Sequence, residues 1–129
     1  MSRGKVLIVE DEFIQFLSLE ELMLERGFEV CGPASTSDEA IEMALAERPD
    51  VVLMDVSIQG GRDGIDTARE IDARCRIPVI LTTGYDSAEV YEKARTVKTA
   101  GFFLKPYEVE DLMAAIEASI RNQNPITRP

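Results

Sequence analysis

The amino-acid sequence predicts a doubly wound α/β fold, in which helices cover both faces of a parallel sheet. Five short apolar runs alternate with longer stretches of helical periodicity. Several runs are continuously apolar, which is typical of parallel strands buried on both faces. The stretches between them hold about 13 to 20 residues each, enough for one helix and two short loops. A length of 129 residues fits a single domain.

The apolar runs are the predicted strands. They cover Val6 to Val9, Phe28 to Cys31, Val51 to Met54, Val79 to Leu81 and Phe102 to Leu104. Right-handed crossovers between parallel strands distribute the helices over both faces and bring the carboxyl ends of all strands to one edge. Ligands and chemistry in such sheets gather at that edge.

The stretches between the strands carry helix signals. Four helices are predicted over 36–48, 65–74, 87–98 and 108–120, and Thr36 followed by Glu39 matches a capping box at the start of the first of these four.

The helix after the first strand has an unusually wide apolar face, spanning an arc of about 160°. It consists of Phe13, Phe16, Leu17, Leu19, Met23 and Leu24. Two interpretations are open: burial of the whole face between the sheet and the last helix, or an exposed surface for a partner or for a homodimer.

Composition excludes several classes of function. A net charge of −10 without a basic stripe argues against direct binding of nucleic acid or of anionic membranes. The early run Val6 to Val9 is too short for a signal peptide or a membrane span, so a cytoplasmic protein is expected. Cys31 and Cys75 form no CxxC pair and are expected to be reduced, packed thiols.

Chemically active residues stand where the predicted strands end. Glu10 and Asp11 follow the first strand, Asp55 the third, Thr83 the fourth and Lys105 the fifth. Carboxylates packed together repel one another unless a cation lies among them, and hard oxygen ligands select Mg²⁺. A lysine and a threonine hydroxyl suit phosphoryl oxygens. The set therefore predicts phosphoryl transfer onto an aspartate.

The sequence resembles the receiver domain of two-component response regulators. The motifs that carry the resemblance are "KVLIVEDE" at 5–12, "PDVVLMDVSI" at 49–58, "IPVILTTGY" at 77–85 and "GFFLKPYE" at 101–108. The resemblance implies a (βα)5 flavodoxin-like fold with strand order 2-1-3-4-5.

The predicted last helix fades near Arg121, and the polar, proline-punctuated stretch "NQNPITRP" after it divides the chain into two parts. Residues 1–121 would form the receiver domain, and residues 122–129 a polar tail or the start of a linker.

The resemblance also implies roles for the acidic residues. Asp55 would accept a phosphoryl group from a phosphohistidine. Mg²⁺, with Mn²⁺ as a substitute, would be held by Asp11, by Asp55 and by the backbone carbonyl of Ser57, with indirect help from Glu10. The protein would catalyse its own phosphorylation and slow dephosphorylation without being a conventional turnover enzyme.

Further implied roles concern the switch. Thr83 and Lys105 would contact the phosphoryl oxygens, and Thr83 with Phe102 would form the switch that changes an output surface over 86–120. For Phe102, an ordinary core position is the alternative. The family also suggests a cis peptide bond between Lys105 and Pro106.

The loop after Asp55 departs from the commonest pattern of the family. Gln59 stands where many receivers have proline, and Gly64 lies nine residues after Asp55 rather than eight. A longer, more mobile loop is expected. Ser57 and Tyr85 flank the expected path of a hydrolytic water and are predicted to modulate dephosphorylation.

Other classes of protein fit less well. A flavodoxin-like cofactor binder needs a Gly, Ser or Thr-rich phosphate loop where this chain has three acids, and an aspartyl-phosphate phosphatase needs an acid at position 57. A phosphorylation-independent pseudo-receiver that binds proteins remains the alternative. The expected partners are a sensor histidine kinase or histidine phosphotransfer protein, and a downstream protein or a missing output domain.

Overall fold

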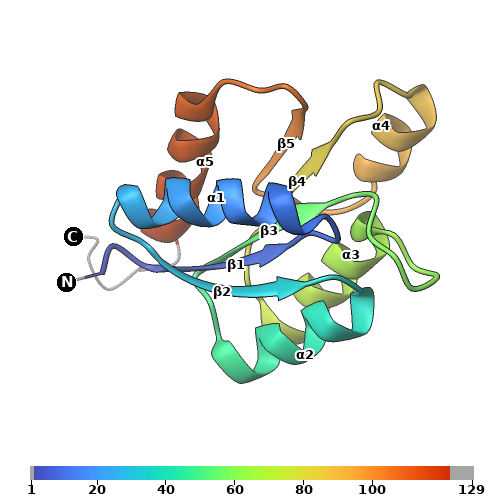
Figure 1. The fold of residues 1–129 in the computed structure, drawn as a ribbon. Helices are drawn as coiled ribbons and strands as arrows, with labels where there is room; N and C mark the ends of the chain where they lie inside the picture. Colours follow the sequence, from blue (N-terminus) through green and yellow to red (C-terminus); the bar gives the residue numbers. More distant parts are fainter. Residues whose placement is uncertain (1, 123–129) are drawn as a thin grey trace.

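The computed structural model describes residues 2–122, whose five strands form one parallel sheet between two layers of helices (Figure 1). The strand order is β2-β1-β3-β4-β5, so the predicted fold class and strand order are confirmed. The strands are β1 (Lys5–Val9), β2 (Glu29–Ala34), β3 (Val51–Asp55), β4 (Val79–Thr83) and β5 (Gly101–Leu104).

The helices divide between the two faces of the sheet. The first face carries α1 (Phe13–Glu25) and α5 (Val109–Asn122), and the second carries α2 (Ser37–Glu47), α3 (Gly64–Cys75) and α4 (Ala88–Ala94) (Figure 1). None of the helices in the described part of the chain is long and apolar enough to cross a membrane. The tail expected at 122–129 lies, after Asn122, outside the described residues.

The continuously apolar strands contribute side chains to two hydrophobic cores, one on each face of the sheet. In β1, Val6 and Ile8 face α1 and α5, whereas Leu7 and Val9 face α2 and α3. All four side chains are buried, because successive residues of a strand point to opposite faces and helices cover both. This arrangement holds the central strands rigidly and fixes the position of the residues at their carboxyl ends.

The edge strand β2 is longer than predicted and runs on through Gly32 and Pro33 to Ala34. Proline is tolerated there because an edge strand has one unpaired side. Gly32 has a φ of +113°, and a Cβ atom at this position would lie 2.6 Å from the carbonyl oxygen of Ile8. Only glycine permits this close approach of the two strands.

Helix α4 is shorter than the predicted segment 87–98 and ends at Ala94. The β-branched residues Thr96 and Val97 follow shortly after it, and such residues have a lower helix propensity. The Thr96 hydroxyl donates to the carbonyl of Lys93 at 2.7 Å, and the Val97 amide bonds to the Ala94 carbonyl in a tight turn. Such side-chain bonds compete with the helical ladder.

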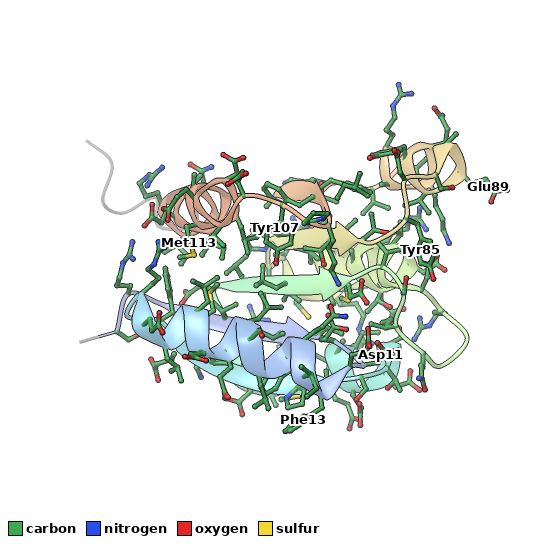
Figure 2. All side chains as sticks on the ribbon, turned by 45° about the horizontal axis from the view of Figure 1, so that its top comes forward. Asp11, Phe13, Tyr85, Glu89, Tyr107 and Met113 are labelled. Atoms are coloured by element: carbon green, nitrogen blue, oxygen red, sulfur yellow. The ribbon has the colours of Figure 1, made fainter. Side chains whose placement is uncertain are left out.

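The wide apolar face of α1 is only partly covered. Phe16 and Met23 are buried against the sheet, but Phe13 is 61% exposed, and Leu17 and Leu24 are also exposed. Figure 2 shows Phe13 on the side of α1 that points away from α5. Burial of the whole face is therefore contradicted, and the alternative of an interface stays a prediction.

Candidate functional site

Three carboxylates meet where β1 and β3 end. Glu10 and Asp11 directly follow β1, and Asp55 is the last residue of β3, which pairs with β1 in parallel. One oxygen from each of the three carboxylates lies within 4.8 Å of the others. Figure 2 shows Asp11 at this edge of the sheet. The structure thus brings together the three acidic side chains that were expected to meet.

Burial sets the electrostatics of this group. Glu10 is 3% exposed and Asp55 7% exposed, while Asp11 is half-buried. Burial raises the pKa of Asp55, although Lys105 and the Ser57 backbone amide act in the opposite direction. Burial also raises the pKa of Glu10, and the neighbouring Asp55 charge raises it further. Both carboxylates therefore hold their protons more strongly than free ones and would gain from a nearby cation.

Lys105 is the only cationic side chain within ion-pair distance of these carboxylates in the described residues. Its Nζ lies 3.6 Å from Glu10 Oε1 and 3.6 Å from Asp55 Oδ1, beyond an ordinary hydrogen bond. The same Nζ donates to Gln15 Oε1 at 2.8 Å. The peptide bond between Lys105 and Pro106 is cis. We call Glu10, Asp11, Asp55 and Lys105 the strand-edge cluster.

This composition fits a divalent cation. Three carboxylates against one ammonium leave an excess of two negative charges when all are ionised. The oxygen atoms are close enough to be bridged by one ion, and oxygen is the ligand type that Mg²⁺ prefers. The strand-edge cluster is therefore consistent with a metal site.

Thr83 ends β4 and is fully buried. Its Oγ1 accepts a hydrogen bond from the backbone amide of Tyr85 at 3.1 Å, and its carbonyl accepts one from the Lys105 amide at 2.7 Å. The second bond ties the end of β4 to the residue that carries the cluster's ammonium. Tyr85 itself is 62% exposed and lies past the end of β4 (Figure 2).

Phe102 of β5 is partly buried and packs against α4. Its ring centroid lies 5.2 Å from that of Tyr91, with the planes tilted by 35°. A change in the position of Phe102 would therefore directly alter its contact with Tyr91, a side chain of α4.

The loop 56–64 folds back so that its last residue contacts the end of β3. The Gly64 amide donates to the Val56 carbonyl at 2.9 Å, and a Cβ atom on Gly64 would lie 2.3 Å from the carbonyl oxygen of Asp55. Val56 and Ile58 are buried, while Gly60 and Gly61 at the exposed tip have positive φ. The loop thus has a fixed base, and the Gln59 amide donates to the Ser35 carbonyl at 3.4 Å on the way to the exposed tip.

A second group of charges joins the end of this loop to α4, and sequence reasoning missed it. Lys93 Nζ lies 2.8 Å from Asp63 Oδ2 and 3.1 Å from Asp66 Oδ2. Asp63 also caps α3 by accepting from the Asp66 amide at 2.9 Å. We call Asp63, Asp66 and Lys93 the inter-helix cluster. Gln15 was missed as well, because its side-chain contact with Lys105 spans 90 positions of sequence.

Comparison with known proteins gives one consistent result. A family model described as response regulator receiver domain matches residues 6–117. The transcriptional regulatory protein PdtaR of Mycobacterium tuberculosis is 37% identical over 123 residues, which are 95% of this chain and 60% of that protein. The chain therefore spans less than two thirds of the length of this curated relative.

Solved structures show the same likeness. The signal receiver domain of a modulated diguanylate cyclase from Desulfovibrio desulfuricans superposes with a TM-score of 0.86 at 31% identity, covering 94% of this chain and 96% of that one. A CheY-like receiver domain protein from Methanospirillum hungatei superposes with a TM-score of 0.84, covering 97% of this chain and 99% of that one. At 23% identity the second likeness concerns the fold alone.

Proposed function

The chain belongs to the response regulator receiver domain family, and from that premise we propose that it is a phosphorylation-dependent switch of a two-component system. Asp55 accepts a phosphoryl group from a phosphohistidine. The observation that carries the proposal is the burial of the Asp55 carboxylate beside two further carboxylates and one ammonium at the edge of the sheet. The proposed receiver domain covers residues 1–121.

The chemistry is an exchange of one bond for another. A carboxylate oxygen of Asp55 attacks the phosphorus atom, the phosphorus–nitrogen bond of the donor breaks, and the imidazole nitrogen takes its electron pair. An acyl phosphate is formed. Because β3 is buried on both faces, the nucleophile is held in place and only its end meets the donor.

The negative charge that develops must be balanced. Asp11, Asp55 and the Ser57 carbonyl would hold Mg²⁺ or Mn²⁺ with indirect help from Glu10, and the ion would neutralise charge on the phosphoryl oxygens. Lys105 is close enough to Asp55 to donate to a phosphoryl group attached there.

The switch begins with an additional partner for the Thr83 hydroxyl. Its hydroxyl oxygen accepts from the Tyr85 amide, and the hydroxyl hydrogen is free to donate to a phosphoryl oxygen. Movement of Thr83 toward the phosphoryl group leaves space for Phe102, whose ring contacts Tyr91 on α4. The output surface at 86–120 changes as a consequence.

The partners follow from the chemistry. Receiver domains interact with histidine kinases, and these 129 residues contain no histidine, so the donor lies outside them. We propose a sensor histidine kinase or histidine phosphotransfer protein as donor, and a downstream protein or an attached output domain as receiver of the signal. The proposal includes a cytoplasmic location, where the free thiols of Cys31 and Cys75 would stay reduced.

Incubation with acetyl phosphate and Mg²⁺ tests the proposal. Intact mass should increase by one phosphoryl group in the wild type and stay unchanged in Asp55→Asn. A wild type that gains no phosphoryl group from acetyl phosphate or from any histidine kinase would favour the phosphorylation-independent pseudo-receiver instead.

A further inference from the structure

The ammonium of Lys105 has one close side-chain partner among the described residues, and that partner is an uncharged amide. Lys105 Nζ donates to Gln15 Oε1 at 2.8 Å, while the two nearest carboxylate oxygens, on Glu10 and Asp55, are both 3.6 Å away. An ammonium between two carboxylates would be expected to bond to them first, because charge-assisted hydrogen bonds are the stronger kind. A specific contact therefore draws Lys105 toward α1.

Gln15 is itself held in one orientation. Its Nε2 donates to Glu12 Oε1 at 2.5 Å, and its Oε1 accepts from Lys105. A carboxylate only accepts and an ammonium only donates, so a flipped amide would satisfy neither partner. Glu12 precedes α1 directly and Gln15 lies in its first turn. The pair forms a short bridge from the start of α1 to Lys105.

The distances suggest what this bridge achieves. A lysine side chain is long and flexible, and a shift of about 1 Å would bring its Nζ into direct hydrogen bonds with either carboxylate. Such a bond would occupy a carboxylate oxygen that a cation needs and would make Asp55 a weaker nucleophile. In the structure the ammonium forms only long ion pairs of 3.6 Å with the two carboxylates, which keeps it near enough to attract a phosphoryl group. Its hydrogen bond of ordinary length goes to Gln15 instead.

We propose that Gln15 is a positioning residue that restrains Lys105, so that the oxygens of Glu10 and Asp55 stay available to a divalent cation and to the incoming phosphoryl group. The cation part stands on the contacts alone. The phosphoryl part rests on the proposed function.

Gln15→Met tests the idea, because methionine has nearly the same length and helix preference but lacks the amide acceptor. Lys105 should then close onto Asp55 and Glu10 and compete with the ion. The dissociation constant for Mg²⁺, measured by titration followed through backbone amide NMR shifts of Asp11, Asp55 and Ser57, should rise about fivefold. Gln15→Ala serves as a second variant with the same expected direction.

Lys105→Met supplies the matched control. If Gln15 acts through Lys105, then Gln15→Met should leave Mg²⁺ affinity unchanged in a Lys105→Met background, as a double-mutant cycle requires. Folding of each variant is checked by its thermal unfolding curve.

Two results would overturn the proposal: an unchanged Mg²⁺ affinity in Gln15→Met and Gln15→Ala, or an equal loss of affinity with and without Lys105. Because the titration uses Mg²⁺ alone, its outcome is independent of phosphorylation. A wild type that binds Mg²⁺ but accepts no phosphoryl group would refute the proposed function and leave only the role of Gln15 toward the cation standing.

Discussion

The strand-edge cluster and the inter-helix cluster are both built from carboxylates and one lysine, but they differ in burial and in charge balance. In the inter-helix cluster, Lys93 lies 2.8 and 3.1 Å from its two carboxylates, and all three side chains are a third or more exposed. In the strand-edge cluster, Lys105 stays 3.6 Å from two nearly buried carboxylates, and a third adds to the excess.

The difference separates an ion pair with balanced contacts from a buried cluster with unbalanced charge. Exposed pairs with direct contacts contribute about 0 to 1 kcal/mol to stability and need nothing further. Buried carboxylates with too little positive charge are costly to the metal-free protein, and their pKa values rise accordingly. A bound cation would relieve that cost, so the unbalanced cluster is where we expect binding.

The largest expected effect on stability comes from Gly64, which follows Asp63 of the inter-helix cluster and packs against Asp55 of the strand-edge cluster. Gly64→Ala places a Cβ atom 2.3 Å from the Asp55 carbonyl oxygen and 2.9 Å from Met54 Cγ. The backbone must shift, and the free energy of unfolding should fall by about 3 kcal/mol, measured by urea denaturation.

Gly84→Ala is the matched control for this substitution. A Cβ atom there meets no other atom within 4 Å, so stability should change by less than about 0.5 kcal/mol. If the free energy of unfolding fell equally in the two variants, the tight return of loop 56–64 would not be the reason why position 64 requires glycine.

Removal of the Asp55 charge should stabilise the metal-free protein. Burial raises the pKa of Asp55 and of Glu10 in the folded state, so between pH ~4 and the folded pKa values these two groups bind more protons in the folded protein than in the unfolded chain. The free energy of unfolding therefore falls as the pH rises from this value through the folded pKa values. Asp55→Asn should raise the free energy of unfolding on the order of 1 kcal/mol at pH 7 without Mg²⁺.

The exposed Asp86 provides a comparison, since Asp86→Asn should change stability by a few tenths of a kcal/mol at most. A destabilised Asp55→Asn protein at pH 7 would mean that the ionised carboxylate is already satisfied without a cation.

The inter-helix cluster should show a smaller effect with the opposite pH dependence. Burial by itself raises the pKa of Asp63, but the bonds from Lys93 and from the Asp66 amide together lower it. Its contribution is therefore present above pH ~4 and is lost as the pH falls through the lower folded value. Asp63→Ala should cost about 1 kcal/mol through loss of the helix cap and of the ion pair.

Asp63→Asn separates these two contributions. Asparagine still caps α3 but carries no charge, so its cost should be about 0.5 kcal/mol or less and should shrink at high salt. Chemical denaturation at two salt concentrations measures both variants. Equal costs for Asn and Ala would assign the whole effect to the ion pair.

A small effect on stability is also expected at Tyr85. Its ring is largely exposed, so Tyr85→Ala should leave the free energy of unfolding within about 0.5 kcal/mol of wild type. If the ring shields the acyl phosphate, the phosphorylated state should decay several-fold faster in this variant, as followed by loss of the phosphoryl mass. An unchanged decay rate would count against a shielding role.

Prediction from sequence succeeded where the position of a side chain depends on the end of a strand. Asp11, Asp55 and Lys105 could be grouped because parallel strands deliver their carboxyl ends to one edge, whatever the loops do. The end of α4 was missed because it depends on a side-chain bond of Thr96 that periodicity does not register.

The contacts of Gln15 and Lys93 were missed for a different reason. Each joins elements far apart in the sequence, and the residue types are common on helix surfaces. Exposure of Phe13 likewise depends on how α1 sits against the sheet, which its apolar pattern does not determine.

Paramagnetic broadening by Mn²⁺ tests the contrast between the two clusters most directly. Trace Mn²⁺, added to the ¹⁵N-labelled wild type, should broaden the backbone amide signals of Asp11, Asp55 and Ser57 first and leave those of Asp66 and Lys93 sharp at the same concentration. Excess Mg²⁺ should reverse the broadening, and Asp55→Asn should weaken it. Broadening that begins at the inter-helix cluster, or that is equal at both, would contradict the account.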